Sequence, residues 1–293
     1  ALDSETYAYF EQYPVSGVTC EKIDALEAFE PRLNATKASR SQMEYYFTCT
    51  PILISYVMQK LASPGSTAIY LDADLFFFDD PSIVVADLDD NDVGIISHKY
   101  QLRLRKKLSK YGTYNVGWLG FRDSANGRVV LDWYRERTLE WCFDKPEDGK
   151  YADQGYLDWF PQFDGVTELT SPGFNLAPWN SANYRVLAHD RQVYVNESPL
   201  VFFHFHGLRR VKSWFVTSQL VYSAPASRNL MNLVYRPYVS LLNTNEQLVS
   251  RRLQARTSIK PRGHGLRGWL GRSRKQAVNL ASVLSGNALY LRD

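Results

Sequence analysis

The sequence predicts an α/β fold built on a mainly parallel sheet. Two observations carry this prediction. Apolar runs of strand length alternate along the chain with longer segments of helical periodicity. The run TAIYL at 67–71 is apolar throughout, which is typical of a strand buried on both faces of a parallel sheet. The 293 residues, 45% of them hydrophobic, are enough for one large domain with an extension.

The first predicted element is a helix at 48–61, where Thr50 can cap the helix and Pro51 fits its first turn. The strand at 67–71 follows after the break SPGS. Alternating or continuous apolar residues and one amphipathic pattern then predict strands at 91–96, 114–121 and 199–207 and a helix at 128–143.

Composition excludes some classes of function. The net charge of +3 is too small to indicate binding of nucleic acid. The three cysteines lack the spacing of a metal or redox motif, which favours a reducing, cytoplasmic location. We find neither an apolar run of membrane-spanning length nor a signal peptide. The chain begins at Ala1 without an initiator methionine, so we expect it to be a fragment.

Two carboxylates interrupt the hydrophobic stretch AIYLDADLFFFDDP at 68–81. Asp72 and Asp74 come directly after a strand, where open α/β sheets bind ligands, and positions i and i+2 point the same way. Buried charge needs a partner, and carboxylate oxygens suit Mg²⁺ or Mn²⁺ bridging to a diphosphate. The alternative interpretation is a pair of helix-cap or turn acids.

Other acid-x-acid triplets in the chain can be compared with Asp72 and Asp74. Two further acid-x-acid triplets lie at 87–89 and 90–92, in the polar stretch ADLDDNDV with no strand before them. We expect those residues to be solvated turn acids. The preceding strand is therefore what distinguishes Asp72 and Asp74.

The stretch IYLDADLFFFDDP resembles the metal-binding DXD motif of GT-A-fold glycosyltransferases, especially those of the family 8 type. The resemblance extends over roughly residues 35–210 and is closest to bacterial members, in LEWCFDKPEDGKYADQ and FFHFHGLRR. It implies a GT-A-like three-layer fold with a mainly parallel central sheet, here lacking its first strand. It also implies a transferase that moves a sugar from a nucleotide-sugar donor, expected to be a UDP-sugar, with a retaining course.

A second motif of that family occurs in VFFHFHGLRR. His204, Gly207 and Arg210 match its spacing of histidine, glycine and lysine, with arginine in place of lysine. By this resemblance His204 is the third metal ligand, beside Asp72 and Asp74. Imidazole in the ligand set favours manganese over calcium, so we expect Mn²⁺ or else Mg²⁺.

Neighbours of this histidine extend the prediction. Arg209 and Arg210 are expected at the phosphates, where a guanidinium can bind in forked geometry. His206 lies on the same strand face as His204, and the sequence does not decide whether it also binds metal. The alternative for both histidines is hydrogen bonding to backbone or water.

Two segments resemble the part of the family that holds the donor sugar. In GTYNVGWLGF, Asn115 offers amide hydrogen bonds to sugar hydroxyls and Gly117 allows close backbone approach. In KYADQGYLDWF, Asp153 would hold sugar hydroxyls and Gln154 would sit beside the anomeric carbon. The alternatives are a glycine bulge and an aspartate that only caps the following helix.

Three residues complete the predicted substrate site. Asn175 and Trp179, in SPGFNLAPWN, are expected on the acceptor side, together with Asn180. A core or loop-anchoring role is the alternative for Trp179. Arg40 resembles the arginine that reaches the nucleotide, although it could equally be a lone surface arginine.

The C-terminal part differs in charge. Nine Lys and Arg residues lie between Arg251 and Lys275 with no acid among them, and four glycines punctuate the stretch. We therefore predict a glycosyltransferase domain at 1–212 and a helical, basic extension at 213–293. One hypothesis is peripheral contact of this segment with an anionic membrane surface, and the alternative is a solvated tail.

Together these features predict a metal-dependent glycosyltransferase that acts on a saccharide or lipid-linked acceptor in envelope or polysaccharide synthesis. Two alternatives stay open. An aspartate-nucleophile phosphatase also places Asp-x-Asp after a strand, although usually near the start of its domain. A catalytically degenerate sugar-binding module would bind saccharide without metal or nucleotide.

Overall fold

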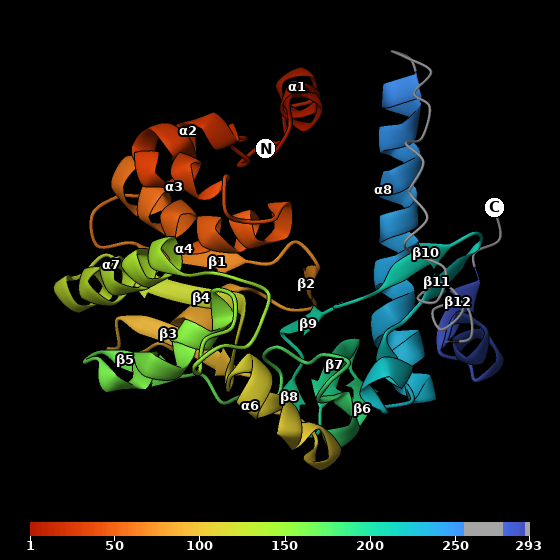
Figure 1. The fold of residues 1–293 in the computed structure, drawn as a ribbon. Helices are drawn as coiled ribbons and strands as arrows, with labels where there is room; N and C mark the ends of the chain where they lie inside the picture. Colours follow the sequence, from red (N-terminus) through yellow and green to blue (C-terminus); the bar gives the residue numbers. More distant parts are fainter. Residues whose placement is uncertain (255–277, 291–293) are drawn as a thin grey trace. The chain divides into compact units, whose positions relative to one another are not determined.

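The computed structural model describes residues 1–254 and 278–290 (Figure 1). Contacts divide the chain into two compact units. Unit 1 comprises Ala1–Asp72, Val84–Ser97 and Lys106–Leu169, and unit 2 comprises Ala73–Ile83, His98–Arg105 and Thr170–Asp293. The domain boundary predicted at residue 212 is a separate division and stays a prediction.

A four-stranded sheet in the order β1-β4-β3-β5 forms the centre of unit 1. β4 (Tyr114–Arg122) runs antiparallel to both β1 (Thr67–Leu71) and β3 (Val93–Ser97), whereas β5 (Val166–Glu168) is parallel to β3. The α/β class is thus confirmed, and the described sheet is mixed: β1, β3 and β5 run in one direction, and β4 alone departs from the predicted parallel arrangement. β4 is buried along most of its length, and burial on both faces gives the same apolar sequence whichever way a strand runs.

Several helices belong to the same unit as this sheet. In unit 1 they are α1 (Ser4–Gln12), α2 (Ile23–Phe29), α3 (Pro31–Thr36), α4 (Gln42–Lys60), α6 (Leu108–Tyr111), α7 (Ala125–Glu140) and the 3₁₀ helix η2 (Gln154–Gln162). Two short helices, α5 (Ser82–Ala86) and the 3₁₀ helix η1 (Leu102–Lys107), cross the boundaries of the units. Figure 1 shows α4 and α7 lying along the sheet.

α4 begins earlier than predicted. Ser41 and Glu44 form a reciprocal capping box, which satisfies N–H groups at the helix start. Thr50 and Pro51 therefore lie inside the helix and do not begin it. The other predicted helix and the strands at 67–71, 91–96 and 114–121 agree with α7, β1, β3 and β4 apart from their ends. The strand predicted at 199–207 is much shorter, since β9 covers only Phe202–His204, and His206 lies in the following turn and not on the strand face of His204.

The core of unit 1 joins α4, α7 and η2 to the sheet through Ile54, Tyr134 and Phe160, all buried. β1 lies at the edge of this sheet among the described residues, and Ile69 and Leu71 on it are 36% and 43% exposed, so the expectation of a strand buried on both faces is wrong for the described residues. The expectation that a first strand is missing beside it stays a prediction.

Unit 2 contains two three-stranded sheets and one strand pair. The sheet orders are β6-β7-β8 and β10-β11-β12, and β2 pairs with β9. The strands are β2 (Leu75–Phe77), β6 (Val186–His189), β7 (Gln192–Val195), β8 (Ser198–Pro199), β9 (Phe202–His204), β10 (Arg209–Val211), β11 (Trp214–Val216) and β12 (Ala288–Tyr290).

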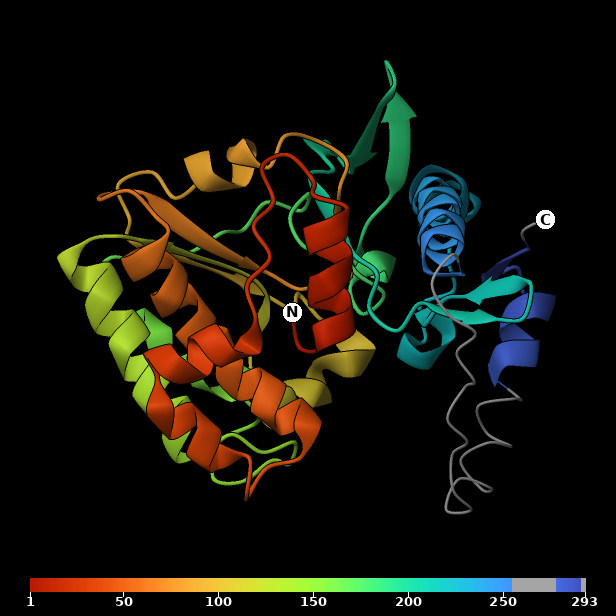
Figure 2. The same cartoon turned by 90° about the horizontal axis from the view of Figure 1, so that it is seen from above.

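Helices of unit 2 pack on these strands. They are the 3₁₀ helices η3 (Ser181–Asn183) and η4 (Gln219–Tyr222), the π-helix η5 (Leu230–Tyr235), α8 (Arg236–Gln254), which is seen end on in Figure 2, and a helical segment at 278–284. A buried cluster that includes Phe203, Phe205, Tyr235 and Leu289 forms the core. Because β12 pairs antiparallel with β11, the end of the described chain belongs to the sheet of unit 2.

Within 1–254 and 278–290, no helix combines the length and apolar composition needed to cross a membrane. The predicted basic segment lies mostly outside the described residues. Only its first members, Arg251 and Arg252 in the last turn of α8, are described.

Candidate functional site

The predicted site residues divide between the units. Unit 1 holds Arg40, Asp72, Asn115, Gly117, Asp153 and Gln154, and unit 2 holds Asp74, Asn175, Trp179, His204, Arg209 and Arg210. The sharing of one ion by Asp72, Asp74 and His204 therefore stays a prediction. Each unit brings some of its own predicted residues together.

Asp72 continues β1 by one residue. Its N–H donates to the carbonyl oxygen of Gly117 on β4 at 2.9 Å. The hydroxyl of Tyr70, two residues earlier and on the same side of the strand, donates to Asp72 Oδ1 at 2.9 Å. Burial, and then the charge of Asp72, raises the pKa of Tyr70, so the hydroxyl keeps its proton and remains a donor.

Asp153 is a buried carboxyl group, 3% exposed. Burial raises its pKa to about 7; the Thr50 side chain opposes this by hydrogen bonding, and the charge of Asp72 adds to it. Asp153 precedes η2 but makes no capping hydrogen bond with its side chain, so the interpretation as a mere helix cap is wrong. Near neutral pH this group can hold or release a proton.

Two amide side chains of unit 1, Gln154 directly after Asp153 and Asn115 on β4, bond to each other. Asn115 Nδ2 donates to Gln154 Oε1 at 3.2 Å, and Gln154 Nε2 donates to the carbonyl oxygen of Tyr111 at 2.7 Å. Asn115 Oδ1 accepts from the N–H of Gly117 at 3.2 Å. The residues predicted to hold a sugar are therefore connected, and these bonds fix the orientation of both amides.

In unit 2, Asp74, His204 and His206 form a group that could hold a metal ion. Their ligand atoms all lie within 4.8 Å of one another, and His204 Nε2 is 3.0 Å from Asp74 Oδ1. The pairing of β2 with β9 explains this proximity, since Leu75 stands opposite His204 and the N–H of Phe205 donates to Asp74 O at 2.8 Å. His204 is buried, Asp74 is half-buried and His206 is exposed.

The pKa values of this group reflect its crowding. Burial alone would raise the pKa of Asp74, but the hydrogen bond from His204 and the histidine charges hold it below its usual range. Partial burial of the His206 ring, and then the charge of His204, lowers the pKa of His206. A carboxylate and a neutral imidazole are the forms that bind metal ions.

Trp179 is buried inside unit 2, next to the two histidines. Its ring centroid lies 5.0 Å from that of His204 and 5.6 Å from that of His206, both edge on, and it is 3% exposed. Burial leaves little of the ring for stacking on an acceptor sugar. Within the described part of the chain, Nε1 of Trp179 has no hydrogen-bond partner.

The two asparagines near Trp179 shape its loop. Asn175 is fully buried in the left-handed region at φ 57°. Asn180 Nδ2 donates to the carbonyl oxygens of His98 and Asn175, both at 3.0 Å, and its Oδ1 accepts from the N–H of Ala177 at 2.9 Å. The Asn180 side chain therefore bonds to the backbone of its own loop and of His98. A role of Asn175 in binding the acceptor stays a prediction.

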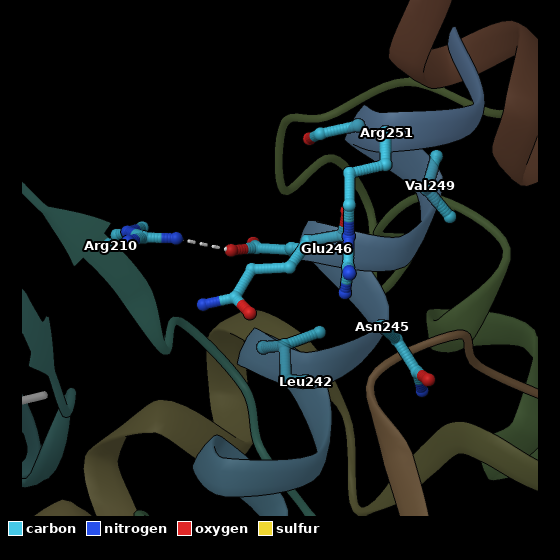
Figure 3. Close-up of a pocket in the computed structure, with 8 residues that line it drawn as sticks. Arg210, Leu242, Asn245, Glu246, Val249 and Arg251 are labelled. Atoms are coloured by element: carbon cyan, nitrogen blue, oxygen red, sulfur yellow. Dashed lines mark hydrogen bonds and ion pairs between the residues drawn. The ribbon is translucent and has the colours of Figure 1, made fainter. Parts of the chain in front are cut away.

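Arg210 lines a pocket of about 780 Å³ between β10 and α8, shown in Figure 3. Its Nη1 donates to Glu246 Oε2 at 2.6 Å, so its charge is already paired. The guanidinium of Arg209 bonds to the side chain of Asn279. Phosphate binding by either arginine stays a prediction, and Arg210 would have to exchange Glu246 for phosphate.

Arg40 is buried between α4 and α7. It donates to the Thr48 hydroxyl and, at 2.6 Å, to the carbonyl oxygen of Leu139, and burial lowers its pKa. These bonds show a role in helix packing. A nucleotide contact of Arg40 stays a prediction.

Sequence reasoning missed two supporting residues. Tyr70 could have been found, because it precedes Asp72 by two positions on the same strand. Thr50 was interpreted as a helix cap, whereas its side chain bonds to Asp153 from within α4. Asp87, Asp89 and Asp90, by contrast, lie exposed in turns as expected. Asp92 differs from the prediction, because it is half-buried before β3 and accepts from Asn126 Nδ2 at 3.1 Å.

Fold and site together define an α/β protein with a mixed sheet and an Asp-His-His group suited to a metal ion. The chain is 33% identical to the uncharacterised protein YfnF of Bacillus subtilis (strain 168) over 221 residues, 72% of this chain and 71% of that protein. It is 29% identical to the uncharacterised protein YfnD of the same organism over 241 residues, 81% and 76% of the respective chains. The chain therefore belongs to the same protein family as YfnF. Neither a family model nor a solved structure matches it.

Proposed function

We propose that the protein is a metal-dependent glycosyltransferase of GT-A type. It would move a sugar from a nucleotide-diphosphate donor, with a UDP-sugar as the expected donor, to a saccharide or lipid-linked acceptor. The observation that carries the proposal is the 3.0 Å contact between Asp74 and His204. These residues lie far apart in the sequence, and the family 8 resemblance assigns both to one metal ion.

Within this proposal, Asp74 and His204 hold the ion, and Asp72 is predicted to join them. Bound Mn²⁺ or Mg²⁺ would neutralise the diphosphate leaving group as the glycosidic bond breaks. The resemblance, together with the bonded amides of Asn115 and Gln154, supports a role for unit 1 in binding the sugar hydroxyls.

Asp153 has a distinct part in the proposed reaction. Because its pKa lies at about 7, it can accept a hydrogen bond from a sugar hydroxyl when ionised and donate one when protonated.

The three cysteines are free thiols, which supports a reducing compartment such as the cytoplasm.

A thermal-shift screen tests the proposal. Nucleotide diphosphates and nucleotide sugars are added to the full chain with and without Mn²⁺, and the melting temperature is recorded. We expect stabilisation by a nucleotide diphosphate only with Mn²⁺; a ligand at about 100 times its Kd contributes about 2.7 kcal/mol.

Two variants make the screen specific. Asp74→Asn should abolish the Mn²⁺-dependent shift. Asp89→Asn should retain it, because Asp89 lies in an exposed turn with φ 49°, where asparagine is readily accommodated. A nucleotide shift of the same size in both variants, or none in the unaltered chain, would contradict the proposal. Trapping of fluoroberyllate by the chain would instead favour the phosphatase.

A further inference from the structure

His206 is the member of the Asp-His-His group that the sequence left undecided. It lies in the turn that follows β9, and its ring centroid is 5.9 Å from that of His204. Gly207 comes next with φ 70°, and a Cβ there would meet Ser218 at 3.0 Å. The turn at His206 and Gly207 thus has little conformational freedom, and it sets the position of the second imidazole.

The spacing of the three groups suits a coordination sphere. Two ligands at right angles, each about 2.1 Å from a metal ion, lie about 3.0 Å apart, and two opposite ligands lie about 4.2 Å apart. The Asp74–His204 separation of 3.0 Å equals the first distance. The 4.8 Å limit on the whole group slightly exceeds the second, so the three ligand atoms already lie close to the spacing that one ion requires.

Neighbouring rings hold the two imidazoles in place. Trp179 packs edge on against both, and the ring of Tyr222 lies 6.1 Å from that of His206. Because His204 is buried and His206 is exposed, an ion between them would meet protein on one side and solvent on the other. The solvent side would leave positions for water or for ligand oxygens.

We propose that His206 is a protein ligand of the metal ion together with Asp74 and His204, so that unit 2 alone supplies two imidazoles and one carboxylate. This inference rests on the proposed function only for the role of the ion, and not for its binding. Two nitrogen ligands favour Mn²⁺, Co²⁺ and Zn²⁺ over Mg²⁺ and Ca²⁺, which prefer sites made of oxygen. The site is therefore selective for transition metals.

Metal titration of the chelator-treated full chain tests this assignment. Isothermal titration with Mn²⁺ should show one site, and the same titration with Mg²⁺ should show far weaker binding. His206→Ala should weaken Mn²⁺ binding about tenfold or more, since a ligand is lost. Its exposure means that truncation leaves the core of unit 2 in place. His189→Ala is the matched control, because His189 is exposed and contacts Asp190 instead.

Nitrogen couplings provide a second measurement on the same samples. Electron spin echo spectra of bound Mn²⁺ should show two coupled imidazole nitrogens in the unaltered chain and one in His206→Ala. Unchanged affinity or unchanged couplings in that variant would overturn the assignment, as would the absence of Mn²⁺ binding by the unaltered chain. The expected metal pattern without any nucleotide binding would overturn the proposed function and leave this inference standing.

Discussion

Replacing Asp153 by asparagine should change stability in a pH-dependent way. The free energy of unfolding of Asp153→Asn, compared with that of the unaltered chain, should become larger as the pH rises. Asp153 is buried, with a pKa of about 7 in the folded protein against 3.8 for an ordinary aspartate. A folded-state pKa above the unfolded value means that the group favours folding most below about pH 4. That contribution is lost as the pH rises through about 7.

The expected size follows from the two pKa values. About three pH units at 1.36 kcal/mol each give a cost of about 4 kcal/mol for ionising Asp153 inside the fold above pH 7. Part of this cost is already present at about pH 5, so the stability difference between the two proteins should grow by about 3 kcal/mol from about pH 5 to about pH 8. Hydrogen bonds lost in the variant shift all values by a constant and leave this growth unchanged.

Urea unfolding in the presence of a chelator, followed by tryptophan fluorescence at several pH values, measures the difference. Leu157→Val is the control, because Leu157 is fully buried in the same helix η2 and carries no ionisable group. Its effect, about 1 kcal/mol, should not depend on pH. The reasoning would be refuted if the difference in free energy of unfolding between Asp153→Asn and the unaltered chain also stayed constant from about pH 5 to about pH 8.

Three further predictions concern the turn, the ion pair and the basic segment. Gly207→Ala should destabilise the protein by roughly 2 kcal/mol in urea unfolding, because an alanine there combines φ 70° with a close contact of its Cβ at 3.0 Å. The control Gly17→Ala, at φ 76° in open space, should cost roughly 1 kcal/mol. Equal costs for the two variants would show that the close contact does not destabilise the protein. Glu246→Gln should cost less than about 1 kcal/mol, since the pair with Arg210 is exposed, and a loss that persists in about 1 M salt would contradict a screened pair. Replacing the seven Lys and Arg residues at 256–275 by Gln should reduce co-sedimentation with anionic vesicles at low salt, by about 1 kcal/mol per cation; unchanged sedimentation would refute the membrane hypothesis.

Periodicity predicted the elements of the fold better than their directions. The apolar run at 67–71 coincides with β1, because a short apolar strand bounded by breaks leaves a clear local pattern, although that pattern does not reveal that β1 is an edge strand of the described sheet. The direction of β4 depends on which neighbours it pairs with, and no local pattern contains that information. The start of α4 was visible in the S-x-x-E signature at Ser41, but Pro51 drew the prediction to a later start.

The candidate site shows the same difference between local and distant information. The resemblance predicted that Asp74 and His204 share a function, but their contact arises from the pairing of β2 with β9, which is long-range. The partner of Arg210 was also unpredictable, because Glu246 lies on a helix that approaches β10 only in the folded chain. The elevated pKa of Asp153 results from burial, which a polar segment such as KYADQ does not indicate.

The pairing of β12 with β11 changes how the basic segment should be handled in the laboratory. Leu289 belongs to the core of unit 2, so residues on both sides of 255–277 are anchored in the same compact unit. A protease cut within 255–277 would therefore yield a nicked protein whose two pieces co-purify under native conditions and separate only on denaturation. Deleting everything after α8 would instead remove a sheet strand, so such a truncation would confuse loss of charge with loss of folding. For the same reason, an affinity tag placed after Asp293 would retain the rest of unit 2 under native conditions even after such a cut.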